Sequence, residues 1–273
     1  MQSVWRTYGI VLIVAAVVGA LPFAGTSTFY LRIGALVFIF SLAVLGINLL
    51  MGFAGQVSLG HAGFFGIGAY AVAVLPTHFA VPSWIALIVG VIVAGLLAFV
   101  IGRPILKLKG HYLAVATLGM GILIAMVFTN EARFTGGPDG MPVPRLELFG
   151  WRARGSEAWY WISGVTLVLA ALLAVNLIDS PTGRALRAIH DSEVASRVLG
   201  IDVARYKLIA FVLSAIYAAI AGAYLALFDG LVTPATAGFL RSIEFVTMAV
   251  LGGLGSIFGS IVGAALLTIL PQM

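Results

Sequence analysis

The hydrophobic positions of this chain fall into long runs separated by short polar segments. Each run is close to the ~20 residues that an α-helix needs to cross the hydrocarbon core of a bilayer. The pattern predicts eight such runs, at about 9–24, 33–51, 52–75, 82–101, 111–129, 159–178, 208–228 and 245–270. The predicted fold class is therefore an all-α, polytopic bundle of membrane helices. One transmembrane domain over 1–273 accounts for the whole length, and no soluble domain can be separated from it.

Two of the eight runs allow a second interpretation. The first run follows Arg6, a layout that a signal peptide shares. No clear small-x-small cleavage site precedes Pro22, so a retained membrane anchor is favoured over a cleaved signal. The third run, Gly52 to Leu75, is rich in glycine and could be a re-entrant or broken helix. That alternative would change which side of the membrane the later loops face.

One long stretch, Ser180 to Lys207, must be solvated by water rather than lipid. It holds five of the fifteen basic residues and three of the ten acidic ones, between two apolar runs. Pro181 can open the first turn of a short helix, and Leu186 and Ile189 lie on one face of it. The stretch is therefore predicted to be a loop with helical structure of its own.

A second short helix is predicted from Asp191 to Gly200. Asp191 is expected to be its N-cap, and Gly200 is expected to end it by adopting the left-handed conformation. Glu193 adds negative charge where the helix dipole favours it and can pair with Arg197, four residues later. An apolar stripe of Ala195, Val198 and Leu199 lies on the other side. The pattern indicates an amphipathic helix held at a membrane face, with a plain solvated loop as the alternative.

Composition supports the membrane class. Hydrophobic residues make up 62% of the chain and charged residues 9%, against roughly 25% charged in soluble domains. The net charge of +5 indicates membrane topology rather than nucleic-acid binding, because the basic residues sit in particular loops. Arg103 to Lys109 and 180–207 are predicted to be cytoplasmic, two crossings apart, with Arg6 on the same side. The loop 130–158 then lies outside.

The inventory of chemical motifs predicts a transport subunit rather than an enzyme. The chain lacks cysteine, a Gly-x-x-x-x-Gly-Lys-Ser/Thr phosphate loop, His-Glu-x-x-His and Gly-x-Ser-x-Gly, so we expect no cofactor or metal of its own. Ionisable residues are almost absent from the predicted spans, which argues against ion-driven transport. Polar groups that could line a pathway are Gln56, Ser58, His61 and Thr117. Each could instead bond neighbouring helices, and for His61 that packed role is favoured.

Four segments together resemble the LivM-type permease of branched-chain amino acid ABC importers: Gly46 to Leu75, Leu108 to Met141, Gly183 to Ala223 and Val250 to Ala264. Gly-Gln-x-Ser-Leu-Gly-His, Thr-Gly-Gly-x-Asp-Gly and Gly-Arg-Ala-Leu-Arg-Ala-Ile occur in the family's order and spacing. The resemblance is weaker to the partner LivH-type subunit. Family members continue past the last span with another helix and a basic tail, so the end at Met273 leaves a C-terminal truncation open.

The resemblance implies a permease subunit of an ABC importer in the bacterial inner membrane. Its cargo would be leucine, isoleucine and valine, delivered by a periplasmic binding protein. Its partners would be a homologous LivH-type permease subunit and two cytoplasmic ATPase subunits, which use the ATP. Related permeases carry urea or short amides, and a stand-alone channel or ion-coupled carrier is the alternative from another class.

Two candidate sites follow. The resemblance implies that the 180–207 loop contacts the ATPase, through Arg184, Arg187, Asp191, Glu193, Ala195, Val198, Leu199 and Gly200. On the outer side, an exposed backbone and one charge could dock the binding protein, at Gly136, Gly137, Asp139 and Gly140. The alternative for this second group is a plain tight turn.

Overall fold

The computed structural model describes residues 27–148, 151–153 and 155–272, and positions 9, 15, 16, 18, 19 and 22. The first predicted run falls mostly outside the described residues, and so does Arg6. The α-helices are α2 (Thr28–Asn48), α3 (His61–Phe79), α4 (Ser83–Ile105), α5 (His111–Asn130), α6 (Ala132–Thr135), α7 (Gly155–Asp179), α8 (Pro181–Asp191), α9 (Glu193–Val198), α10 (Val203–Asp229), α11 (Phe239–Gly252) and α12 (Ile257–Ile269). The remaining elements are η2 (Leu49–Phe53), η3 (Gly137–Asp139), η4 (Pro234–Ala237), η5 (Leu270–Gln272), β1 (Met141–Pro142), β2 (Glu147–Leu148), β3 (Trp151–Arg152) and β4 (Leu231–Val232).

Within the described ranges, six helices are long and apolar enough to cross a membrane. They are α2 with its π-helical extension η2, α3, α4, α5, α7 and α10. Each corresponds to one of the hydrophobic runs, because a run of that length buries its backbone hydrogen bonds within a single helix. The all-α, polytopic prediction is confirmed, and the chain is a multi-pass membrane protein.

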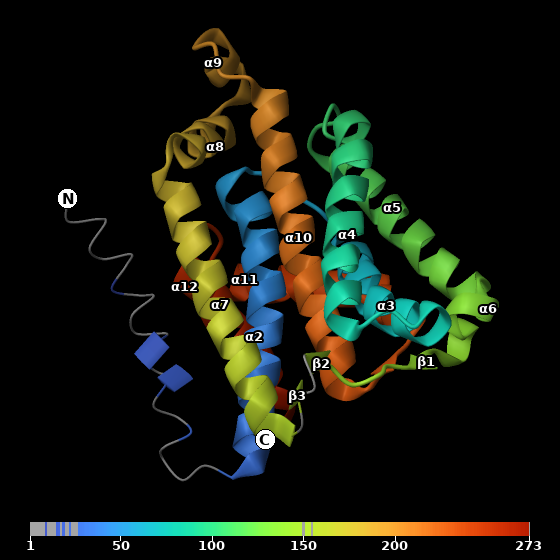
Figure 1. The fold of residues 1–273 in the computed structure, drawn as a ribbon. Coiled ribbons are helices and arrows are strands. Elements are labelled where there is room, and N and C mark those ends of the chain that lie inside the picture. The colour runs from blue at the N-terminus through green and yellow to red at the C-terminus, as the bar shows by residue number, and fades with distance from the viewer. Residues whose placement is uncertain are drawn as a thin grey trace.

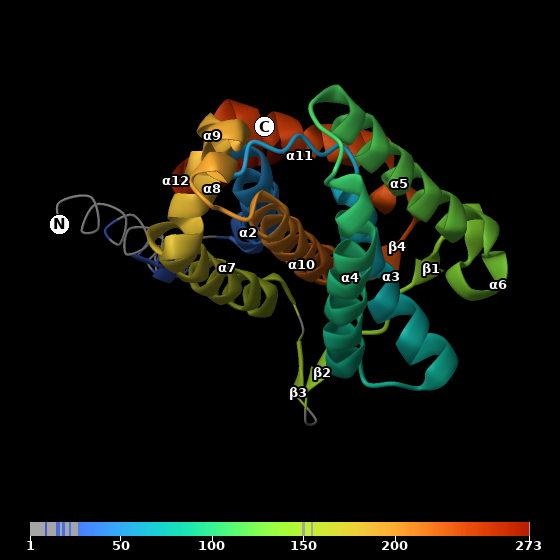
Figure 2. The same cartoon turned by 90° about the horizontal axis from the view of Figure 1, so that it is seen from above.

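The centre of the bundle is α2. It packs against α7, α10 and α12, and α3 lies against the far side of α10 (Figure 2). The stretch from Val37 to Met51 is buried throughout and carries no charged residue. A helix that is apolar all round is stable only when other helices surround it, which is why this run occupies the core. By contrast, α4 and α5 stand at one side with most of their surface facing outward.

The crossing of α3 and α10 depends on two glycines. Gly68 lies against the backbone of Ala219, and Gly222 lies against the backbone of Phe65. A β-carbon at either glycine would overlap the facing carbonyl group, so the helices can approach this closely only at residues without a side chain. The contact fixes α3 against α10 and thereby positions His61, the first residue of α3.

The two basic segments share one end of the bundle. In Figure 1, α8, α9 and the turn between α4 and α5 lie at the upper end, while α6 and the short strands lie at the other. Lys109 in that turn forms an ion pair with Glu193 of α9, at 4.0 Å. The predicted grouping of the basic segments is therefore confirmed, and the cytoplasmic assignment of that end stays a prediction.

We expect single cysteines to report opposite sides of the membrane. Asp191 and Asp139 are both exposed, at opposite ends of the bundle, and the chain has no cysteine to interfere. In intact cells an impermeant maleimide should label the Asp139→Cys variant and leave Asp191→Cys unmodified until the membrane is opened. Gly137 is a poor labelling position because it is buried with φ +64°. Labelling of both variants from one side would contradict the topology.

The glycine-rich segment 52–75 is a broken crossing, one of the two alternatives that the sequence left open. After η2, residues 54–60 descend as irregular backbone, and α3 begins inside the bundle at His61. Irregular backbone at this depth is stable only where protein supplies its hydrogen bonds. Gln56 N–H donates to the carbonyl of Leu50 (3.1 Å), and Leu59 N–H donates to Thr117 Oγ1 (3.1 Å).

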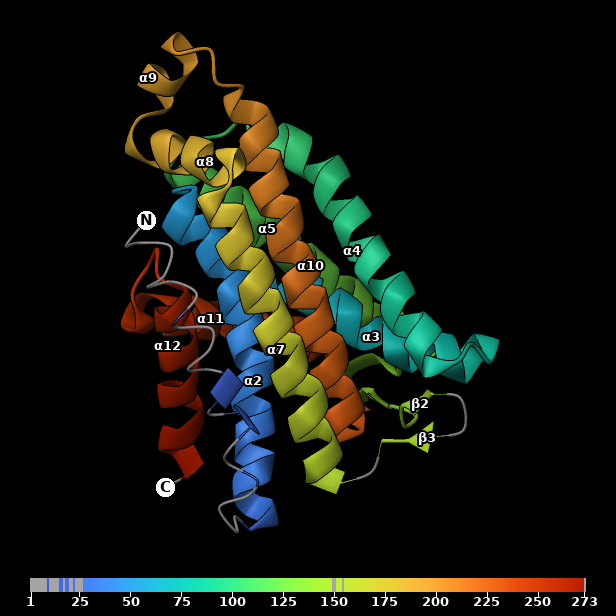
Figure 3. The same cartoon turned by 60° about the vertical axis from the view of Figure 1, so that its left-hand side comes forward.

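The last predicted run, 245–270, is two helices rather than one continuous span. The chain breaks after α11, turns through Gly253 (φ +102°) and Gly255 (φ +76°), and returns as α12 (Figure 3). Asn48 of α2 closes this turn: its Oδ1 accepts from Gly255 N–H (2.8 Å), and its Nδ2 donates to Ser256 O (2.7 Å) and Ser260 Oγ (2.6 Å). The prediction of one continuous span is therefore wrong. Hydropathy could not reveal the turn, because the turn is stabilised by hydrogen bonds to a buried asparagine from a distant helix.

Short strands organise the end opposite the basic segments. β1 pairs antiparallel with β4, with Met141 opposite Val232, and β2 pairs antiparallel with β3. Val143 N–H extends the first pair by donating to Gly230 O (2.9 Å). The loop after α5 is thereby joined to the chain that leaves α10.

Candidate functional site

At the basic end, α8 is fixed to the last turn of α7. Ser180 caps it, since its Oγ accepts from Thr182 N–H (3.1 Å) and Gly183 N–H (3.4 Å). Pro181 occupies the first helical position, where its missing N–H costs nothing. Leu186 and Ile189 are both buried, as their shared face predicts. The predicted first helix is confirmed.

Arg184 and Arg187 also bond the last turn of α7, where α7 meets α8. Arg184 Nη1 donates to Asp179 O (3.2 Å), and Arg187 Nη2 donates to Ile178 O (2.9 Å). Arg187 also lies 3.9 Å from the Asp179 carboxylate. Cations at the carbonyl end of a helix satisfy groups that the helix leaves unpaired. Their role within the chain is therefore to hold α8 on α7, and their contact with a partner stays a prediction.

The N-cap of α9 is Ser192, so the prediction of Asp191 is wrong. Ser192 has extended backbone (φ −160°, ψ 112°), and its Oγ accepts from Ala195 N–H (3.2 Å). Asp191 is the last residue of α8, since a single extended residue joins the two helices. Asp191 is exposed at this joint.

Replacing Ser192 by alanine should loosen α9, and replacing Asp191 should not. Loss of an N-cap hydroxyl costs about 1 kcal/mol, which corresponds to roughly fivefold more frequent opening of the helix. Hydrogen exchange of the α9 amides, followed by mass spectrometry, should show this acceleration in Ser192→Ala only. Equal acceleration in Asp191→Ala would restore Asp191 as the cap.

The far side of α9 is an exposed apolar surface, here called the apolar tip. It consists of Val194, Ala195, Val198 and Leu199. Val198 is 83% exposed and Leu199 77%. Gly200 ends the helix with φ +80°, as predicted, and its N–H donates to Arg197 O (3.0 Å). Apolar side chains gathered this way at a polar end mark an interaction surface. Val194, at 68% exposed, belongs to the tip although the predicted stripe omits it.

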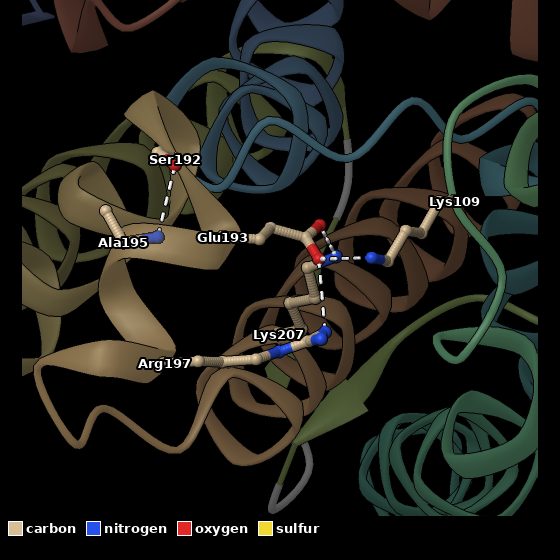
Figure 4. Close-up of polar contacts among 6 residues, drawn as sticks. All are labelled: Lys109, Ser192, Glu193, Ala195, Arg197 and Lys207. Carbon is tan, nitrogen blue, oxygen red and sulfur yellow. Dashed lines mark hydrogen bonds and ion pairs between the residues drawn. The ribbon is translucent and has the colours of Figure 1, made fainter.

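Glu193 connects α9 to the membrane helices. Its carboxylate pairs with Lys207 of α10, lies 3.4 Å from Arg197 and 4.0 Å from Lys109 in the turn after α4 (Figure 4). The pairing with Arg197 confirms the predicted contact four residues along the helix. In Figure 4, Glu193 and Ala195 point in opposite directions, so α9 presents charge to the bundle and the apolar tip away from it.

Lys207 is the partner that the sequence did not single out. Its side chain is only 5% exposed, and a buried ammonium group is stable only when paired and hydrogen-bonded. Fourteen residues separate it from Glu193, a spacing with no helical periodicity. The one available signal is that both residues belong to the same solvated stretch. The ion pair links α9 to the start of α10.

A second polar group lies inside the bundle at the start of α3. His61 Nε2 lies 3.1 Å from Ala43 O of α2, and Nδ1 lies 3.2 Å from Ser214 Oγ of α10. A carbonyl oxygen only accepts, so Nε2 carries the proton and Nδ1 accepts from the serine hydroxyl. Ser214 is eleven residues into α10, about 16 Å from its start, or about half of the hydrocarbon thickness. His61 is thus a packed, satisfied histidine, the favoured interpretation.

The other three pathway candidates are also buried. Thr117 holds residue 59, as described above, and its hydroxyl donates to Ala114 O (2.9 Å). The side chains of Gln56 and Ser58 are buried, and neither has a hydrogen-bond partner among the described residues. Buried polar atoms without a hydrogen-bond partner destabilise a helix bundle unless water or another molecule bonds to them. The structure places Gln56 and Ser58 in the irregular segment 54–60, His61 directly after it and Thr117 in contact with it. Their part in translocation stays a prediction.

The loop that is predicted to lie outside contains a tight turn. Gly136 (φ +77°, ψ 0°) adopts the left-handed conformation, and Gly140 (φ +74°, ψ −167°) adopts an extended backbone at positive φ that is open mainly to glycine. Gly140 N–H donates to Gly137 O (3.1 Å). Thr135 Oγ1 closes the preceding turn on Phe128 O (2.6 Å). The backbone of this turn therefore requires the glycines, which agrees with the alternative interpretation of this group as a tight turn. Asp139 is the only charged residue of the four candidates and is exposed, and docking stays a prediction.

Comparison with known proteins adds the family context. A family model described as "Branched-chain amino acid transport system / permease component" matches residues 29–273. The LivM permease protein of the high-affinity branched-chain amino acid transport system of Escherichia coli (strain K12) is 34% identical over 265 residues, which cover 88% of this chain and 62% of that protein. The chain therefore spans less than two thirds of that relative's length.

More distant relatives have similar printed names. The LivH permease protein of Salmonella typhimurium (strain LT2) is 29% identical over 250 residues, 84% of this chain and 79% of that protein. The BraD permease protein of Pseudomonas aeruginosa is 26% identical over 246 residues, again 84% and 79%. The identity to LivM exceeds that to LivH, as the motifs indicate. No solved structure gives a significant match.

Proposed function

Because the chain belongs to the family of branched-chain amino acid transport permease components, we propose that it is a membrane-spanning subunit of an ATP-binding-cassette importer. Its proposed cargo is leucine, isoleucine and valine, delivered by a periplasmic binding protein across the bacterial inner membrane. The chain itself supplies the path and no catalysis. ATP would be hydrolysed by two cytoplasmic ATPase subunits, and a LivH-type permease would complete the membrane part.

One observation carries this proposal: a short helix presents an exposed apolar tip to the solvent while an ion pair ties its other side to a spanning helix. Val198 and Leu199 lie on the first side, and Glu193 with Lys207 on the second. An amphipathic helix of this kind fits a groove on a partner protein. A rigid tie to α10 supports transmission of the partner's movement to the spans. A stand-alone channel has no use for such a surface.

The intramembrane polar groups fit a pathway driven from outside the chain. His61 is neutral by its hydrogen bonding, and the six spanning helices carry carboxylates only near their ends. Glu244 of α11, the helix whose Ser242 accepts from Ala62 N–H, is paired with Arg241. Ion-coupled carriers usually place such groups at mid-depth as relays. Gln56 and Ser58 offer neutral donors and acceptors beside the broken crossing, so they are the side chains proposed to meet the cargo or its water.

The test is reconstitution with the partner subunits in proteoliposomes. ATP-dependent uptake of labelled leucine, supplied with its binding protein, should exceed uptake of labelled urea, and the permease alone should take up neither. Urea uptake that exceeds leucine uptake would favour the urea or amide permease. Uptake by the permease alone, without ATPase or binding protein, would favour the stand-alone channel or carrier and overturn the proposal.

Reversing the charge at Asp139 should weaken the response to the binding protein. Asp139 is exposed at the outer rim, where a charge steers a partner's approach without supporting the fold. In Asp139→Lys the loaded binding protein should stimulate ATP hydrolysis several-fold less, with basal hydrolysis unchanged. Asp139→Asn, which keeps the turn, should lie between the two. Unchanged stimulation across a full titration would leave Gly136, Gly137, Asp139 and Gly140 as a turn only.

A further inference from the structure

A groove with a volume of about 800 Å³ lies between the basic end of α4 and the start of α10, beside α9. We call it the basic groove. Six of the fifteen Lys and Arg residues of the chain line it, with two acidic residues: Arg103, Lys107, Lys109, Arg197, Arg205 and Lys207 with Glu193 and Asp202. This concentration of positive charge is not needed to pair the carboxylates within the groove.

The two carboxylates are already engaged. Glu193 pairs with Lys207, Arg197 and Lys109. The Asp202 carboxylate caps α10 by accepting from Arg205 N–H (3.1 Å). Among the described residues, Arg103, Lys107 and the Arg205 guanidinium have no ion-pair partner, and all three are exposed. The basic groove therefore has unpaired cations that would attract an anion from outside the chain.

The opposite wall of the basic groove is apolar. Phe99, Leu106 and Leu208 line it, and only about a third of the most apolar stretch of α4 is buried inside the bundle. The outward positions of α4 just before the groove are large and apolar, with Leu96 59% and Val100 63% exposed. Arg103 lies over the Phe99 ring, 4.2 Å from its centroid, where a guanidinium sits at the boundary of lipid and water. The groove thus lies where the exposed apolar face of α4 meets the basic end of the bundle.

We propose that the basic groove binds the phosphate headgroup of an anionic phospholipid, of the phosphatidylglycerol or cardiolipin class. Arg103, Lys107 and Arg205 contact the phosphate, and the acyl chains lie along the exposed face of α4. Basic pockets between membrane helices at a cytoplasmic face recognise such headgroups through this combination of charge and apolar surface. The proposal does not depend on which cargo the permease carries.

The test compares two double variants of the full-length protein, each lacking two exposed arginines. Arg103→Gln/Arg205→Gln removes unpaired cations of the basic groove, and Arg133→Gln/Arg145→Gln removes the same charge at the opposite end of the bundle. Binding of a fluorescent phosphatidylglycerol to purified protein in neutral detergent should fall roughly twenty-fivefold in the first, because each of its two arginines near an anionic headgroup contributes about fivefold. The second variant and the charge-preserving Arg103→Lys/Arg205→Lys should bind within about twofold of the native chain.

The competitors identify the source of the anion. Glycerol 1-phosphate and inorganic phosphate should displace the lipid only weakly, and phosphatidylcholine should not bind comparably. Equal competition by soluble phosphate would make the basic groove a phosphate site and overturn the lipid proposal. Equal loss in both double variants, or equal retention of phosphatidylcholine, would also overturn it. A failure of transport would leave this result unaffected, because the measurement uses the purified permease without its partners.

Discussion

A permease with glutamate at Ala195 should insert normally, keep α9 folded and lose its ATPase. Ala195 is three residues after the cap Ser192, so glutamate there completes a Ser-x-x-Glu capping box that favours the helix. The same carboxylate enters the middle of the apolar tip beside Val198 and Leu199. If a partner groove covers this surface, the charge is buried without a partner, at a cost of roughly 3 kcal/mol, or more than about a hundredfold in affinity. Co-purification of the ATPase with the Ala195→Glu chain measures the loss.

The matched control is Ala195→Gln. Glutamine also completes the capping box but carries no charge, so it should weaken co-purification far less than glutamate does. Val198→Leu keeps the surface apolar and should retain the ATPase and transport. If Ala195→Glu inserts, holds its ATPase and still transports, the segment 180–207 is a solvated connector and the proposed coupling role is wrong.

Local chemistry at the basic end was predictable from the sequence. Leu186 and Ile189 lie three residues apart, and the helix that this spacing predicts buries both. The pair Glu193 and Arg197 follows from the same helical geometry, and Gly200 ends the helix because it can adopt positive φ. The error at Asp191 arose because two adjacent polar residues can each act as an N-cap. Which of them does so depends on where the preceding helix ends.

Contacts between distant segments were not predictable. Asn48 reads as one polar residue in an apolar run, and only the bundle shows that it bonds the turn at Gly255 and Ser256. Without that partner, the turn would leave backbone groups unpaired at membrane depth, so hydropathy favoured one continuous helix over two. Lys109 and Lys207 likewise become partners of Glu193 only after α4, α9 and α10 meet. Sequence periodicity shows only which residues share a face of one helix, whereas these contacts join three different parts of the chain.

Replacing Glu193 by glutamine should destabilise the chain and uncouple it from a bound ATPase. The change removes the carboxylate that pairs with Lys207, whose side chain is almost wholly buried. An uncompensated buried ammonium group costs about 3 kcal/mol, so the midpoint of unfolding in a mixed-micelle titration should fall clearly. The apolar tip lies on the other side of α9, so the ATPase should still co-purify (Figure 4). Uptake should fall because α9 is no longer tied to α10.

A second substitution separates stability from coupling. In Glu193→Gln/Lys207→Met both charges are gone, and methionine fills the space of the lysine stem, so most of the lost stability should return. Uptake should stay low, because no ion pair then joins α9 to α10. Lys109→Gln is the control for the longer contact between Glu193 and Lys109. Because this pair is 4.0 Å apart and largely exposed, it contributes at most about 1 kcal/mol. Full recovery of uptake in the double variant would show that Glu193 only neutralises Lys207 and that the ion pair does not transmit movement.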